Sequence, residues 1–394
     1  MTVAGRAHAA SGSTRGWLPI EARIVGVAIG FRAVTALVAF FVSITFPLNA
    51  NQGFSVYRTP HAFWDTFARY DAGWYNQIAS AGYAYAAGGR NNLAFFPLYP
   101  LLMRWGGRLL GGEQQDFYFA GIIVSWVAFA IAMPLVYRLA RLDLPHESAL
   151  RAVAYTAVFP SAYFFGVVYS ESLFFLGLVG AVLALRTRHW IWAAVAGAAM
   201  TATRVNGIMF VPALAWIAWQ SSAGTERVKA ARAIVGASGG FIGYCLHNYW
   251  LSGDPFAWYH AITHWGYQPG GNPVGGLFAI ARALTTRFYQ FLATEHMAPF
   301  DTLNAGLATL VLVMFPFVWR RFGFAYASMI VLGLILPLSS GQFEGLGRYC
   351  SVLFPVPMLL ASSAGETRHL GLIAASAMLY ALGLALFVNV HPLF

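Results

Sequence analysis

One acid in the first quarter of the chain stands among aromatic residues in a way that suits sugar chemistry. Asp71 lies within residues 64–100 (WDTFARYDAGWYNQIASAGYAYAAGGRNNLAFFPLYP). Aromatic rings stack on the apolar faces of sugars, and a carboxylate can accept the proton of a hydroxyl group. The structural alternative is an aromatic belt at a membrane surface, with Asp71 as a helix cap. The aromatic residues are Tyr70, Trp74, Tyr75, Tyr83, Phe95, Phe96 and Tyr99.

Three further ionisable residues lie inside or beside apolar runs. They are Glu171 in VVYSESLFF, Arg204 in TATRVNGIM and Arg348 in GLGRYCSVLFP. Charged groups at membrane depth cost free energy and commonly mark functional sites. Snorkelling, or a structural ion pair between Glu171 and Arg204, would explain the same residues without a functional role.

A second aromatic stretch, residues 247–266 (HNYWLSGDPFAWYHAITHWG), contains Asp254, His260 and His264. The two histidines have the i, i+4 spacing of metal ligands on a helix. No Glu follows His260 as a metalloprotease motif requires, and no carboxylate nearby is at ligand spacing, so we predict no metal site here. Asp254 and His264 remain second-tier candidates for contacts with a sugar or an acceptor.

The composition indicates what must position these residues. Of 394 residues, 59% are hydrophobic and only 10% are charged, whereas a soluble domain carries roughly 25% charged residues. This excludes the soluble enzymes and predicts an all-α polytopic membrane protein surrounded by membrane lipids. The formal net charge of +10 comes from arginines, with Lys229 the one lysine, scattered between apolar runs. Such scattering is typical of loops between membrane spans, so we expect no nucleic-acid partner.

The apolar runs predict about eleven transmembrane helices with the N-terminus in the cytoplasm, because this places every short basic cluster on one side. If residues 94–110 crossed the membrane, the later basic clusters would face outward, so we interpret them as a re-entrant or interfacial helix. Arg32, in the middle of the first run, has no predicted partner. The runs lie near 20–46, 117–137, 152–168, 172–186, 189–203, 207–220, 233–251, 303–319, 322–338, 349–363 and 370–390.

This topology predicts a disordered cytoplasmic tail at 1–16, followed by a single transmembrane domain, 17–394. The large outer loops are at about 47–116, which would hold interfacial or re-entrant helices, and 252–302. Glu171, Arg204 and Arg348 all fall at the outer ends of their predicted spans. In the run at 233–251, overlapping GxxxG spacings predict close helix packing; their glycines are Gly236, Gly239, Gly240 and Gly243.

Five strings in order resemble the PIG-V family, the mannosyltransferases that add the second mannose to glycosylphosphatidylinositol anchors, and its bacterial relatives. The resemblance covers roughly residues 64–360, and five strings in a conserved order are more specific than any one of them. Relatives often have Trp before the acid, whereas this chain has Tyr70, which keeps an aromatic ring. The strings are DAGWYNQIASAGY…AFFPLYPLL, YSESLFF, TRVNGI, YWLSGDPFAWYHAITHWG and RYCSVLFPVP.

The resemblance implies a GT-C glycosyltransferase, a multi-span enzyme that uses a polyprenyl-phosphate sugar on the non-cytoplasmic face. It places the family's essential acid at Asp71 and implies inversion at the anomeric carbon. A lipid-linked phosphate leaves as a stable anion, so it needs cationic support from Arg348 and Arg204 more than it needs a general acid. No D-x-D pair occurs, which favours metal-independent transfer, although Asp65 with Asp71 leaves room for a divalent cation.

These features predict an inverting mannosyltransferase of the bacterial inner membrane, with its active site facing outward. The donor would be a polyprenyl-phosphate sugar, and the acceptor a lipid or a glycan. The aromatic residues beside Asp71 that we expect to contact substrate are Tyr70, Trp74 and Tyr75. The alternative is a multi-span transporter or flippase of lipid-linked or small polar substrates, but the chain shows no internal repeat of the kind common in transporters.

Overall fold

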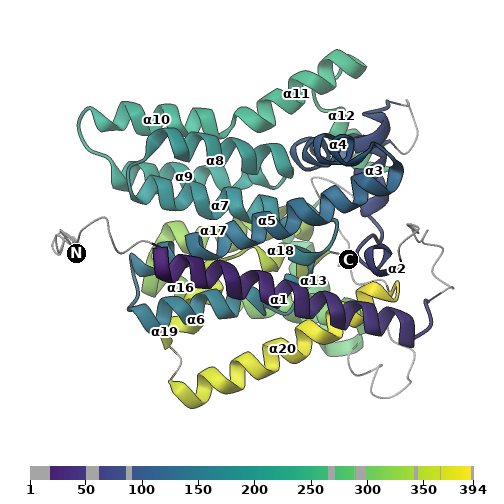
Figure 1. Ribbon diagram of the computed structural model, residues 1–394. Coiled ribbons are helices and arrows are strands. Elements are labelled where there is room, and N and C mark those ends of the chain that lie inside the picture. The colour runs from purple at the N-terminus through teal and green to yellow at the C-terminus, as the bar shows by residue number, and fades with distance from the viewer. Residues whose placement is uncertain are drawn as a thin grey trace.

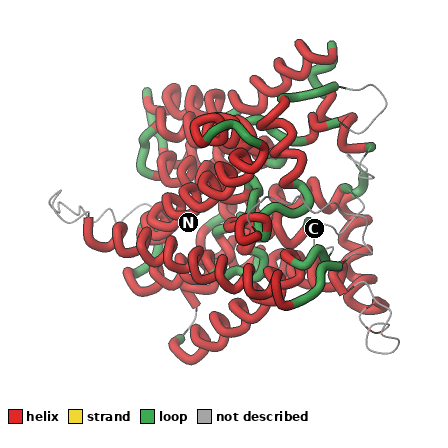
Figure 2. The backbone as a smooth tube through the Cα atoms, turned by 45° about the vertical axis from the view of Figure 1, so that its right-hand side comes forward, coloured by secondary structure: helices red, strands yellow, loops and turns green. Residues whose placement is uncertain are grey.

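The computed structural model describes residues 18–49, 62–85, 91–264, 271–287, 289, 299–340, 345–363 and 365–391. Within these ranges the backbone consists of helices and loops, and no strand occurs (Figure 2). The all-α prediction is therefore confirmed for this part of the chain. The tail predicted at 1–16 lies outside the described residues.

Four helical stretches in the described part of the chain are long and apolar enough to cross a membrane. The shortest has 21 residues, which at 1.5 Å per residue is about 30 Å, the thickness of the hydrocarbon core. The chain is thus a multi-pass integral membrane protein, while the number of spans stays a prediction. The stretches belong to α1 (Leu18–Thr45), α5 (Gln114–Arg141), α15 (Pro299–Val313) joined to α16 (Phe315–Phe322), and α20 (Glu366–Val388).

Shorter elements fill the intervals, and several predicted runs are broken between two of them. The run at 152–168 stops being helical at Ala157, since the residue before Pro160 disfavours the helical conformation. The shorter elements are α2 (Ala62–Asp65), α3 (Ala72–Ala81), η2 (Asn92–Ala94), α4 (Leu98–Leu110), α6 (His146–Ala157), η3 (Ala162–Gly166), α7 (Glu171–Arg186), α8 (Trp190–Thr203), α9 (Gly207–Ser221), α10 (Glu226–Ala237), α11 (Gly239–Ser252), α12 (Ala257–Thr263), α13 (Pro273–Arg282), η4 (Ala283–Arg287), α17 (Phe324–Ser339), α18 (Leu346–Ser351) and α19 (Pro355–Ser363).

The segment predicted as an interfacial or re-entrant helix, 94–110, forms α4 and packs antiparallel against the first half of α5. The Tyr99 hydroxyl contacts the Ser125 hydroxyl at 2.9 Å, and Gly107 lies against the ring of Phe117. The 13 residues of α4 extend about 20 Å, which is shorter than the hydrocarbon core. That this helix does not cross the membrane stays a prediction.

Basic side chains pair with acids at one end of the helical bundle. Arg138 at the end of α5 lies 3.3 Å from Glu21 at the start of α1. Arg186, the last residue of α7, donates to Asp143 at 3.0 Å through Nη2. Figure 1 shows this end at the left, with α6, α16 and α19, whereas α2, α3 and α4 lie at the right.

The glycine-rich run predicted to pack closely is divided into α10 and α11. A Cβ atom at Gly236 would lie 2.8 Å from Cβ of Ala194, and one at Gly240 would lie 2.5 Å from the backbone nitrogen of Ala202, both on α8. Nothing lies within 4 Å of a Cβ built at Gly239 or Gly243. The close-packing prediction is therefore correct for two of the four glycines and wrong for the other two, which face away from α8.

We expect Gly240→Ala to destabilise the protein by about 3 kcal/mol, the upper range for overpacking, because its methyl group would meet backbone atoms that cannot move independently. Gly243→Ala is the matched control and should be neutral or slightly stabilising, since Ala is the better helix former. The check is the unfolding free energy of both variants in detergent micelles. Equal effects of the two substitutions would contradict the packing described above.

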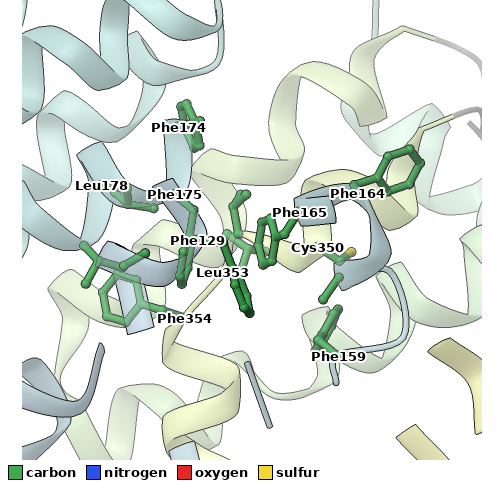
Figure 3. Packing of buried hydrophobic residues seen from close by; sticks show 14 of the residues in the cluster. Phe129, Phe159, Phe164, Phe165, Phe174, Phe175, Leu178, Cys350, Leu353 and Phe354 are labelled. Carbon is green, nitrogen blue, oxygen red and sulfur yellow. The ribbon is translucent and has the colours of Figure 1, made fainter. Parts of the chain in front are cut away.

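Aromatic side chains from α5, η3 and α7 form the centre of the core. The ring of Phe165 lies 5.9 Å from that of Phe129 and 5.1 Å from that of Phe175 (Figure 3). Cys350 and Leu353, from the segment that includes α18, reach the same core in that view. This packing holds the residues that follow η3, including Glu171, against the segment that carries Arg348.

Arg32 of α1 is buried, with 1% of its surface exposed. Its Nη1 donates to the hydroxyl of Tyr380 on α20 at 3.0 Å, and its guanidinium lies 3.8 Å from the ring centre of Phe129. Nη2 is 3.4 Å from the carbonyl oxygen of Ala162. The sequence predicted no partner for Arg32. The structure gives it three neutral ones, a hydroxyl, an aromatic face and a backbone carbonyl, which stabilise its charge.

Candidate active site

Asp71 lies directly before α3, at the end of a turn that follows α2. Tyr70 adopts φ +50°, the left-handed region that a bulky residue seldom occupies and that concentrates at functional sites. A hydrogen bond of 3.1 Å from Val168 N to the carbonyl of Phe67 ties this turn to the segment before α7. The Asp71 side chain makes no capping hydrogen bond to α3, so the helix-cap interpretation does not describe it.

The carboxylate of Asp71 instead faces Arg348. Nη1 of Arg348 donates to Oδ2 of Asp71 at 2.6 Å, and the two side chains are 14% and 15% exposed respectively. α18 holds this arginine in place, because the neighbouring Gly347 donates its N–H to Oδ1 of Asn304 at 2.8 Å. The carbonyl of Gly347 accepts a hydrogen bond from Ser161. A residue 277 positions away in sequence is thereby fixed beside Asp71.

A second ion pair adjoins the first. Glu171 is the first residue of α7 and is 1% exposed, and its Oε1 accepts a hydrogen bond from Nη1 of Arg204. A carboxylate at a helix N-terminus is stabilised by the helix dipole. Nε of Arg348 lies 3.6 Å from the same Oε1. Asp71, Arg348, Glu171 and Arg204 therefore form one linked group, which we call the acid–arginine cluster.

Neutral side chains orient the acid–arginine cluster. The hydroxyls of Tyr75 and Ser170 are 2.9 Å apart, and Nη1 of Arg204 lies 3.5 Å from Oγ of Ser170. The ring centre of Tyr349 is 5.0 Å from the guanidinium carbon of Arg204 and 5.8 Å from that of Arg348. Ser170 and Tyr349 were not predicted as site residues, although each is the direct neighbour of a predicted one.

The tyrosines near Asp71 are neutral hydrogen-bonding groups. Burial raises the pKa of Tyr75 above its ordinary value, and burial likewise raises the pKa of Tyr70. A phenol whose pKa is raised keeps its proton at neutral pH and so cannot act as a general base there. Among these side chains, only the carboxylates can accept a proton readily.

Two of the predicted aromatic contacts point elsewhere. The Tyr70 hydroxyl donates to the carbonyl of His391 at 2.6 Å, and its ring packs 5.6 Å from that of Phe387. Trp74 is partly buried, with its ring stacked 6.0 Å from that of Phe95 at an interplanar angle of 11°. Tyr70 therefore positions the turn beside Asp71, and Tyr75 is the predicted aromatic residue that reaches the acid–arginine cluster.

Asp254 and His264 lie in a different part of the molecule, around α12. Oδ2 of Asp254 is 2.8 Å from Nδ1 of His260, and its Oδ1 accepts from the N–H of Phe256 at 2.8 Å. Nδ1 of His264 contacts the carbonyl of His260 at 3.1 Å. The contacts of the Asp254 carboxylate described here are local ones, so it is not brought to the acid–arginine cluster.

Asp65 and Asp71 both form ion pairs with arginines. Oδ2 of Asp65 lies 3.0 Å from Nη1 of Arg69, and Asp71 is paired with Arg348, so a cation shared by the two acids would have to replace two arginine contacts. Among the described residues, no group of three or more His, Cys, Asp or Glu is arranged to hold a metal ion.

Solved structures with a similar arrangement are distant in sequence. ArnT from Cupriavidus metallidurans, bound to undecaprenyl phosphate, is 13% identical with a TM-score of 0.48, covering 93% of this chain and 77% of that one. The apo oligosaccharyltransferase of Archaeoglobus fulgidus is 11% identical with a TM-score of 0.48, covering 93% and 56%. The chain thus spans a little over half the length of the archaeal enzyme. None of the curated proteins matches the chain in sequence.

A family model matches a large part of the chain. It is described as Mannosyltransferase (PIG-V) and covers residues 41–225. The matched region includes Asp71, Glu171 and Arg204, three of the four members of the acid–arginine cluster. Over this part, a little under half of its length, the chain is similar to the PIG-V mannosyltransferases.

Proposed function

We propose that the protein transfers mannose from a polyprenyl-phosphate donor to a lipid-linked or glycan acceptor, with inversion at the anomeric carbon. The reaction would take place at the acid–arginine cluster, in a GT-C architecture with the site on the non-cytoplasmic face of a bacterial inner membrane. The observation that carries the proposal is the pairing of Asp71 with Arg348, which puts a proton acceptor next to a phosphate-binding group.

The charges of the acid–arginine cluster balance before reaction, with two carboxylates and two guanidiniums. In the transfer step the acceptor oxygen bonds to the anomeric carbon, its proton passes to Asp71, and the bond from that carbon to the phosphate oxygen breaks. The bonding electrons leave with the lipid phosphate. Protonation of Asp71 removes the anion beside Arg348 as the phosphate gains negative charge, so the arginine becomes available to the leaving group.

Geometry supports this division of roles. Within the described residues, the hydrogen bond of Arg348 to Asp71 uses Nη1 alone, and a guanidinium has five N–H donors. Glu171, which is buried and faces both arginines, compensates one of the two positive charges whether or not phosphate is present. Tyr349 lies against both guanidiniums, which restricts their orientation.

The proposal is tested with purified protein, labelled polyprenyl-phosphate mannose and a panel of lipid and glycan acceptors. Arg348→Ala should raise KM for the donor by roughly 10- to 100-fold, the equivalent of one charge-assisted hydrogen bond. Arg348→Lys keeps the charge but not the planar fork, and so should fall between wild type and Arg348→Ala.

An unchanged donor KM in Arg348→Ala would move the phosphate site elsewhere. Movement of the labelled lipid across vesicles without transfer to any acceptor would favour the transporter instead. Both outcomes are measured in the same reconstituted preparation, because the assay records which side of the membrane the label is on as well as which product carries it.

A further inference from the structure

A groove lies at the surface where α9 ends and α10 begins. Its volume is about 530 Å³. The α10 residues that line it fall in two adjacent columns along one face of the helix. The lining residues are Trp219, Arg227, Val228, Ala231, Arg232 and Val235.

The groove is positively charged without a compensating acid. The guanidinium of Arg227 stacks 3.9 Å from the ring centre of Trp219. The acid at the start of α10, Glu226, is already engaged, by Lys229 at 2.7 Å and by Nε1 of Trp190 at 2.5 Å. Within the described ranges, Arg227 and Arg232 have no ion-pair partner. Two such guanidiniums favour an anion with several oxygens, as in a phosphate.

The walls of the groove are apolar and exposed. Trp219, Val228 and Val235 are 57%, 55% and 70% exposed, while the alanines on the other side of α10 are buried. On neighbouring α8, Trp192 is 67% exposed. Apolar surface of this kind is stable in contact with acyl chains rather than water, so a free inorganic anion fits the groove less well than a lipid.

The groove lies at the opposite end of α9 from the acid–arginine cluster. Arg204 is three residues before the start of α9, and Trp219 is two residues from its end, about 20 Å away along the helix. The end of α9 and the start of α10, whose residues line the groove, therefore lie at the basic end of the bundle (Figure 1, left). Basic residues beside apolar ones at a membrane surface attract anionic lipids.

We propose that this groove binds one anionic phospholipid. Arg227 and Arg232 hold the phosphate of the headgroup, with Trp219 orienting Arg227. An acyl chain lies along Val228 and Val235. The proposal depends on the charge and shape of the groove and is independent of any sugar transfer at the other end of the molecule.

Native mass spectrometry of the detergent-purified full chain tests the proposal, with dioleoylphosphatidylglycerol and dioleoylphosphatidylcholine titrated in parallel. Wild type should bind one equivalent of the phosphatidylglycerol in preference to phosphatidylcholine. Arg227→Gln/Arg232→Gln should weaken that first equivalent by about thirtyfold, as expected for two arginines beside an anionic headgroup. Trp219→Leu keeps both charges and should weaken it severalfold.

The matched control is Arg320→Gln/Arg321→Gln on α16, which removes two exposed charges at the same end of the bundle and should leave binding unchanged. If this control weakened phosphatidylglycerol binding equally, the effect would come from the total charge of the protein, and the proposed site would be overturned. A wild type without preference for phosphatidylglycerol would overturn it too. Competition by inorganic phosphate at millimolar concentration would identify a phosphate site in place of a lipid site.

Discussion

Asp71→Asn is expected to lower kcat for mannose transfer by about 10²- to 10⁴-fold, the usual contribution of a positioned general base. Asparagine has nearly the same shape and can still accept the hydrogen bond from Arg348, 2.6 Å away in the wild type, but it cannot take a proton. Because the anion beside Arg348 is lost, donor KM should stay the same or fall. The measurement is steady-state kinetics in detergent or liposomes.

Glu113→Gln provides the control for Asp71→Asn. Glu113 is an exposed acid at the N-cap of α5. It is close to α3, since Asn76 donates to the neighbouring Gln114 carbonyl at 2.9 Å. The activity of the Glu113→Gln variant should match that of the wild type. Wild-type turnover in Asp71→Asn, in protein that is folded and inserted, would remove Asp71 from the role of base.

Glu171→Gln is expected to destabilise the fold by about 3–5 kcal/mol, since removing one partner of a buried pair leaves an uncompensated charge. Glu171 is 1% exposed and faces both Arg204 and Arg348, so two guanidiniums would be left with the single carboxylate of Asp71. The free energy of unfolding, measured by denaturation in mixed micelles, checks this value.

The double variant Glu171→Gln/Arg204→Gln measures how much the two side chains stabilise each other. Removing both charges should restore part of the lost stability, so the two effects should not add. The pair of Glu226 with Lys229, whose side chains are 35% and 62% exposed, is the comparison, and Glu226→Gln should change stability little because solvent screens the pair. Additive effects at Glu171 and Arg204 would mean that the two side chains do not stabilise each other.

Much of the site could be predicted from sequence because of where each residue stands in its apolar run. Glu171, Arg204 and Arg348 all fall at the ends of runs, and alternating spans bring such ends to the same side of a membrane. The sequence predicts that the loop with Asp71 lies on that side too. The pairing itself could not be read, because the contact of Asp71 with Arg348 joins residues 277 positions apart and depends on tertiary packing.

Local pattern was misleading where neighbouring residues satisfy one another. Asp254 stands among aromatic residues just as Asp71 does, yet its carboxylate pairs with His260, six residues further along the chain. The GxxxG spacings likewise could not distinguish Gly240, which packs on α8, from Gly243, which does not. Which face of a helix meets a neighbour depends on crossing geometry, and the spacing of small residues carries only part of that information.

The contact between Arg32 and Tyr380 has a consequence for how the protein is made. Tyr380 is synthesised 348 residues after Arg32, which at about 5–20 residues per second is a delay of roughly 20–70 s. During translation the first helix therefore carries a charge whose partners arrive in order, first Phe129, then Ala162, and Tyr380 last. The contacts described for Arg32 are therefore complete only when α20 has been inserted.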